Sequence, residues 1–172
     1  ETLVTGARAS LRADGGSAGG TILTQAPWLD LRGLRVSAGG GSPGQWRIES
    51  GGDLALVPGN GSFGGYASLV SDTSVAGALS AGSDVGLQAG AAGGPTSQIN
   101  IAPGVNVAAT NPLPVTLSFR TPAGQIMGGV AASGASTGAW SLAGSAPLAL
   151  VFDALSTIGL YGGALRTAGG SV

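Results

Sequence analysis

The stretch Asn111–Pro122, which reads NPLPVTLSFRTP, decides the expected fold of this chain. Between its prolines, polar side chains alternate with the apolar residues Val115, Leu117 and Phe119. A period of two is typical of a β-strand that has one buried and one solvated face. Proline ends such a strand, because it cannot donate a backbone hydrogen bond to a neighbour. The stretch therefore predicts a short, two-faced strand.

The same pattern recurs along the chain, and Gly or Pro interrupts it each time. Trp46 and Ile48 are the expected buried residues of one such segment. The segments are GQWRIESGGDLAL (44–56), DVGLQ (84–88), QINI (98–101), GVNV (104–107) and PLALVFD (147–153). The 34 glycines and nine prolines leave no room for long helices, which tolerate both residues poorly. The sequence predicts an all-β fold.

Three segments share a strand followed by a glycine corner, which suggests a degenerate repeat. They are GGDLALVPG (51–59), GSDVGLQAG (82–90) and TSQINIAPG (96–104). Repeats of this kind favour a β-solenoid in which each turn of chain stacks on the one before it. We expect one such segment over residues 1–172. The alternative is a β-sandwich, although Asn60-Gly61 is the one good signal for a two-residue hairpin.

Residues 58–82 are expected to differ from the rest, as a loop followed by a short helical insertion. PGNGSFGGYAS (58–68) predicts an exposed loop that is built on an Asn60-Gly61 turn. SDTSVAGALSAG (71–82) has apolar residues at helical spacing. Thr73 or Ser74 is the expected N-cap of this helix, and Gly82 is the expected left-handed residue after its end.

The composition excludes several classes of chemistry. The chain has no His, Cys or Lys, so it cannot hold a Ser-His-Asp or Cys-His nucleophilic site, or a thiolate or imidazole metal site. Seven scattered arginines and a net charge of -1 argue against nucleic acid as a partner. No apolar run approaches the ~20 residues that span a bilayer as a helix. We expect no enzyme activity, no cofactor, no metal and no transmembrane segment.

The acidic residues are expected to be solvated and not catalytic. They are Glu1, Asp14, Asp30, Glu49, Asp53, Asp72, Asp84 and Asp153. One Gly-Gly-Asp at 51–53 and a partial copy at 82–84 are too few for a calcium-binding repeat. The expected contacts for a glycan or a protein partner are Phe63 and Tyr66, because they lie in a glycine-rich loop and look exposed.

The segment ALSAGSDVGLQAGAAGGPTSQINIAPGVNV (78–107) resembles the repeat region of bacterial exoproteins of the filamentous haemagglutinin type. Those proteins are passengers of two-partner secretion systems, and related autotransporter adhesins share the repeat style. The resemblance implies a right-handed parallel β-helix and an outer-membrane export partner. It also implies work at the bacterial cell surface or outside the cell, as an adhesin or an extracellular matrix fibre.

One departure from the family limits what the resemblance implies. The family's secretion domain carries Asn-Pro-Asn motifs, and here Asn111-Pro112-Leu113 lacks the second Asn. We therefore expect a non-enzymatic structural and adhesive shaft segment of a longer exoprotein, which binds a glycan or protein on a host or neighbouring cell. The first alternative is a filament subunit that stacks end to end with its own copies. A polysaccharide-binding or polysaccharide-degrading β-helix is the remote alternative.

Overall fold

The computed structural model describes residues 2–4, 9–110, 113–132, 134 and 137–172, so Glu1, Asn111 and Pro112 lie outside the described residues. Over these ranges the chain forms seventeen strands and one helix, which confirms the all-β class. Every pairing between these strands is parallel. The sandwich alternative is wrong, because a sandwich of that class joins antiparallel strands through hairpins.

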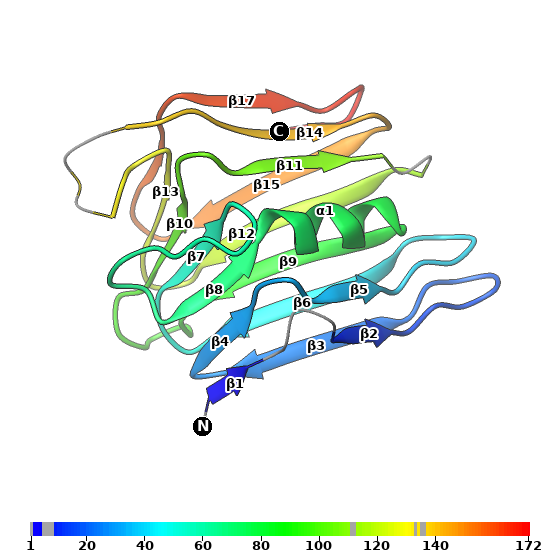
Figure 1. Cartoon of the computed structure of the whole chain (residues 1–172), viewed down its shortest axis with the longest axis horizontal. Coiled ribbons are helices and arrows are strands. Elements are labelled where there is room, and N and C mark those ends of the chain that lie inside the picture. The colour runs from blue at the N-terminus through cyan, green and yellow to red at the C-terminus, as the bar shows by residue number, and fades with distance from the viewer. Residues whose placement is uncertain (1, 5–8, 111–112, 133, 135–136) are drawn as a thin grey trace.

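Two large sheets form two sides of the molecule (Figure 1). The five-stranded sheet has the order β15-β12-β9-β6-β3, and the seven-stranded sheet has the order β1-β4-β8-β7-β10-β13-β16. The strands of the first are β3 (Thr21–Ala26), β6 (Gly44–Ser50), β9 (Ser83–Ala89), β12 (Val115–Thr121) and β15 (Leu148–Ala154). Those of the second are β1 (Thr2–Val4), β4 (Trp28–Leu31), β7 (Leu54–Val57), β8 (Ser68–Ser71), β10 (Gln98–Ile101), β13 (Gln125–Gly128) and β16 (Ile158–Leu160).

The third side combines two small sheets and the helix. One sheet pairs β2 with β5, and the other has the order β11-β14-β17. The helix α1 lies between β5 and β11 and contacts both (Figure 1). The elements of this side are β2 (Ser10–Arg12), β5 (Arg35–Ser37), α1 (Asp72–Ser80), β11 (Asn106–Ala109), β14 (Trp140–Gly144) and β17 (Gly163–Arg166).

The chain visits the three sides in a fixed order, and we call each such set of consecutive elements a rung. The rungs are β3-β4-β5, β6-β7-β8-α1, β9-β10-β11, β12-β13-β14 and β15-β16-β17. Within the five-stranded sheet each rung pairs with the next one in sequence. Each rung therefore supplies the backbone partners of the rung that follows it.

The register between rungs aligns the inward side chains into columns. Val85 of β9 pairs with Trp46 of β6 on one side and with Leu117 of β12 on the other. Phe119 is stacked on Phe152 of β15, with the two ring centroids 5.2 Å apart. The side chains of Trp46, Leu117 and Phe119 are fully buried, which confirms the alternation that the sequence predicts in β6 and β12.

The helix falls inside the segment where the sequence predicts one. Its N-cap is Ser71, whose hydroxyl accepts the Ser74 N–H at 3.2 Å, so the prediction of Thr73 or Ser74 as the cap is wrong. Gly82 follows the helix with a φ of 83°, which confirms the predicted left-handed residue. A helix is about twice as wide as the ~4.8 Å strand spacing. The second rung accommodates this width with two strands, β7 and β8, in the seven-stranded sheet.

Side chains at the two ends of α1 replace the strand that would otherwise pair with β11. At the start of β11, the Asn106 N–H donates to Asp72 Oδ2 at 2.9 Å. Beyond its end, the Thr110 N–H donates to Ser80 Oγ at 3.0 Å. Asp72 is buried, and its Oδ1 also accepts the Gly59 N–H at 2.8 Å. Its carboxylate therefore connects the 58–67 loop, the helix and the next rung.

On the side of α1 that faces the preceding rung, serine hydroxyls form the hydrogen bonds that a neighbouring strand would otherwise form. The Gly33 N–H donates to Ser71 Oγ at 3.3 Å, and the Ala38 N–H donates to Ser83 Oγ at 2.9 Å. The hydroxyl of Ser74 donates to the Leu31 carbonyl at 3.2 Å. Unpaired buried backbone groups are costly, so these short polar side chains allow a helix to interrupt a stack of strands.

We expect Asp72→Ala to destabilise the fold by about 2–4 kcal/mol, because it leaves two backbone N–H groups without their charged acceptor. The matched control is Asp153→Ala, which removes an exposed carboxylate that pairs with Arg120 at 3.2 Å. Exposed ion pairs contribute little, so this loss should stay below about 1 kcal/mol. Urea unfolding of both variants measures the difference, and equal losses would contradict the bridging role of Asp72.

Candidate functional site

Phe63 and Tyr66, the residues that the sequence suggests as ligand contacts, pack against the protein. Phe63 is only 6% exposed, so the expectation that it is exposed is wrong, and Tyr66 is half-buried. Their rings meet edge to face, with centroids 4.9 Å apart. Burial, together with the charge of Asp53, raises the pKa of Tyr66 to about 12. Contact of either ring with a ligand stays a prediction.

The loop that carries these rings also differs from its expected turn. The Gly61 N–H donates to the Pro58 carbonyl at 2.8 Å, so the central residues are Gly59 and Asn60, not Asn60 and Gly61. Gly59 supplies the positive φ of 52°. The loop joins the parallel strands β7 and β8, so it is not a hairpin. The outer face of these strands is buried nevertheless, at Ala55 and Leu69, and we attribute this burial to the loop.

Several acidic side chains accept backbone N–H groups from the next rung. Asp53 Oδ1 accepts from Gln98 at 2.8 Å, and Asp84 Oδ1 accepts from Thr116 at 2.7 Å. The expectation that the acids are solvated is wrong for Asp72, which is buried. These carboxylates hold successive rungs together, and this structural role explains their positions.

A groove lies at the corner where the chain passes from the five-stranded to the seven-stranded sheet. Its volume is about 620 Å³, within the range of ligand pockets. A second hollow of about 270 Å³ on the outer face of the five-stranded sheet shares Glu49 and Gln88 with it. We call the two together the corner groove. Its residues include Gln25, Pro27, Trp28, Gly51, Gly52, Gly90 and Ala91 at the corner, and Arg47, Gly86, Ser118 and Arg120 on the sheet.

The corner is hollow because glycines, which have no side chains, occupy it. The first rung turns the corner sharply, because Pro27 alone separates β3 from β4. The second rung places Gly51 and Gly52 there, and a Cβ built on Gly52 would meet no atom within 4 Å. The Gly51 N–H donates to the Ala26 carbonyl at 3.1 Å, and the Gly90 N–H donates to Ser50 at 2.9 Å. The backbone ladder thus continues around the corner and fixes the shape of the groove.

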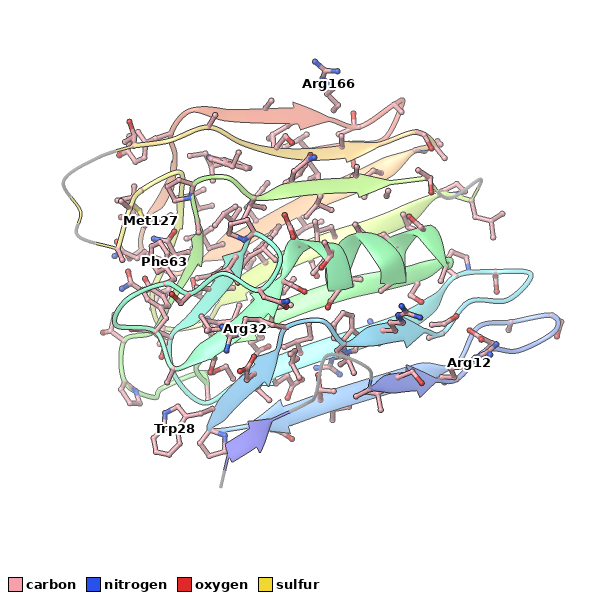
Figure 2. All side chains as sticks on the ribbon, viewed as in Figure 1. Arg12, Trp28, Arg32, Phe63, Met127 and Arg166 are labelled. Atoms are coloured by element: carbon pink, nitrogen blue, oxygen red, sulfur yellow. The ribbon has the colours of Figure 1, made fainter. Side chains whose placement is uncertain are left out.

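An exposed tryptophan lines the groove. Trp28 is the first residue of β4 and is 50% exposed, and Figure 2 shows its side chain pointing away from the ribbon. Its neighbour Leu29 points inward and is fully buried. The strand alternation therefore forces the large ring of Trp28 to the outside, next to the hollow that the glycines leave.

A row of long polar side chains crosses the outer face beside the groove. The strand register aligns Gln25 of β3, Glu49 of β6, Gln88 of β9 and Arg120 of β12. The Gln88 amide donates to the Gly90 carbonyl at 3.2 Å, which holds this side chain against the corner. Neighbouring members of the row are separated by the strand spacing, ~4.8 Å. The groove thus presents amide and charged groups at a regular interval.

The charges in the groove are balanced by ion pairs. Arg47 contacts Glu49 with 2.5 Å between Nη2 and Oε1. Arg120 contacts Asp153 with 3.2 Å between Nε and Oδ2. Two positive and two negative groups therefore cancel, and the groove offers hydrogen-bonding groups without a strong field of either sign.

Glu49 and Asp153, the carboxylates of the two ion pairs, are too far apart to act as a glycosidase pair. Glu49 and Asp153 lie three strands apart, which corresponds to ~14 Å at the usual strand spacing. Retaining and inverting glycosidases need separations of roughly 5 to 9.5 Å. The described residues also hold no cluster of three acids that could bind a metal ion.

The sequence did not indicate the corner groove. Gln25, Glu49 and Gln88 are 24 and 39 residues apart in sequence, counted from 25 to 49 and from 49 to 88. Pro27 directly before Trp28 was a usable signal, because a proline between two strands marks a corner and the next side chain starts a new face. Nothing in the sequence showed which corners stack on each other.

The chain was compared with models of protein families, with curated proteins and with solved structures, and none of them matches. In the part of the chain that the structure describes, no helix has the length and the hydropathy to cross a bilayer.

Asp84 provides a test of how the rungs are held together. Burial raises the pKa of this carboxyl, because the charged form is desolvated. The folded state thus binds the proton more tightly than the unfolded chain, and stability falls as pH rises through the unfolded value of 3.8 and then the folded pKa. Asp84→Asn keeps an oxygen acceptor for the Thr116 N–H and removes the charge.

We expect Asp84→Asn to be at least as stable as the wild type at pH 7, with the difference shrinking as the pH falls below 4. Urea midpoints at both pH values measure this. A variant that becomes less stable than the wild type as pH rises would show that the charged carboxylate is favourable in the fold.

Proposed function

We propose that this chain is a right-handed parallel β-helix and acts as a non-enzymatic structural and adhesive segment of a bacterial cell-surface protein. The observation that carries the proposal is the in-register stacking of five successive rungs through the five-stranded sheet. Crossovers between parallel strands are right-handed in almost all proteins, which supports the proposed hand. A stack of this kind extends in one direction and suits a shaft.

The chemistry of the chain supports an extracellular role of the filamentous haemagglutinin type. The chain has no cysteine, so no disulfide hinders passage in an unfolded state through an outer-membrane export partner. The fold instead depends on apolar columns and backbone ladders, which can form after export. The segment 78–107, which carries the resemblance, covers the end of α1, β9, β10 and the first half of β11.

Adhesion can be tested with beads that carry the folded chain. We expect them to remain on cultured epithelial cells or on Gram-negative bacteria under flow, in larger numbers than beads that carry the same mass of denatured chain. Equal retention of both bead types on every surface would overturn the adhesive role. Release of reducing sugar from cell-surface glycans that are incubated with the chain would overturn the non-enzymatic one.

A second candidate function is that of a filament subunit. Its support is the last rung, where Leu155, Ile158 and Tyr161 are exposed apolar side chains next to strand edges. Exposed edges with apolar side chains recruit further strands. In this case copies of the chain would stack end to end, by contacts that do not close into a ring.

Electron microscopy at micromolar concentration separates the two candidates. The shaft segment should give short rods, whereas the subunit should give filaments that Ile158→Asp suppresses by placing a charge at the contact. Ala108→Asp, which adds the same charge at an exposed position of the middle rung, is the control. Filaments that form equally in both variants would contradict stacking through the last rung.

A further inference from the structure

We propose that the corner groove is a binding site for a neutral oligosaccharide, with Trp28 as the surface on which a sugar ring stacks. The inference rests on the proposed adhesive function and names the chemistry of its ligand. The expected ligand contact is then Trp28, at the corner groove, in place of Phe63 and Tyr66.

Trp28 is the aromatic residue best placed to meet a ligand. Trp28 is 50% exposed, whereas Trp46 and Trp140 are 0% and 3% exposed. Exposure of a flat, apolar indole face to water is unfavourable. The C–H face of a pyranose ring can stack on this face, and the stacking removes both apolar surfaces from water. The hollow above Gly51 and Gly52 leaves room for such a ring beside Trp28.

The row of Gln25, Glu49 and Gln88 supplies the polar contacts. Amides and carboxylates offer paired donors and acceptors, which match the adjacent hydroxyl groups of a sugar. The row repeats at ~4.8 Å, close to the length of one pyranose unit. A linear oligosaccharide can therefore meet one side chain of the row with each successive unit.

The balanced charge favours a neutral sugar over a sulfated or uronic one. Glu49 is paired with Arg47, and Arg120 is paired with Asp153. A polyanion would meet a carboxylate beside each of these cations, whereas neutral hydroxyl groups bind without this repulsion. Recognition through hydrogen bonds and stacking should also depend weakly on salt.

Iodide quenching of tryptophan fluorescence reports on Trp28, because the other two tryptophans are shielded by the protein. We expect at least one neutral probe among cellohexaose, maltohexaose and laminarihexaose to protect the fluorescence from iodide. A heparin hexasaccharide at the same concentration should protect less. Protection by no neutral probe, or stronger protection by heparin, would overturn the proposal.

Variants test whether the groove is the site. Calorimetry with the protecting hexasaccharide should show an affinity loss of about tenfold or more for Trp28→Ala, as for a central aromatic contact. Gly52→Leu should lose a similar factor, because it fills the hollow without meeting any atom within 4 Å at its Cβ. Unchanged affinity in both variants would overturn the assignment.

Matched controls exclude general effects of these substitutions. Tyr161→Ala removes an aromatic side chain that is 49% exposed, and Gly16→Leu adds the same side chain at a glycine with equally open space. Both variants should bind the hexasaccharide as the wild type does. An equal loss in the controls would show that the effect is not specific to the groove.

The bead assay separates this inference from the proposed function. If wild-type beads adhere and Trp28→Ala beads adhere equally well, the adhesive function stands and the groove is not its site. If the hexasaccharide binds the groove but wild-type beads do not adhere to cells, the sugar site stands and the adhesive function fails. If Trp28→Ala abolishes both sugar binding and adhesion, both proposals are supported.

Discussion

The structure depends on one constraint, which is that each rung must satisfy the backbone hydrogen bonds of the next. In the five-stranded sheet the strands do this themselves, over seven residues between β6 and β9 and again between β12 and β15. The same pairing aligns the inward side chains, so the ladder and the apolar columns stabilise each other. Because each rung contacts mainly its neighbours, a local change must be compensated locally.

The helix shows how this compensation works. A helix uses its own backbone groups internally and offers no ladder to the strands beside it. Asp72, Ser71, Ser80 and Ser83 therefore take over, and each accepts an N–H from a neighbouring rung. In the sequence, such side chains are indistinguishable from ordinary capping or solvated residues. Their role in the fold is to carry the hydrogen bonding across the interruption.

The corner groove arises from the same architecture. Strand alternation places Trp28 outside, glycines leave the middle corner hollow, and the register aligns polar side chains from four strands. Each of these features is unremarkable by itself. Together they make a rigid, neutral surface with one large aromatic ring, which is the physical basis of the proposed sugar site.

The sequence by itself determined the strand class, the inward residues of β6 and β12, and the position of α1. These features depend on local alternation and on breakers, which act over a few residues. Tertiary structure decided between the parallel stacking that the repeats favour and the antiparallel sandwich. It alone decided that Phe63 is buried and that Asp72 bridges two rungs. It also assembled the groove from Gln25, Glu49 and Gln88. The reason is that stacking brings together residues from different rungs, and no local pattern specifies which rungs become neighbours.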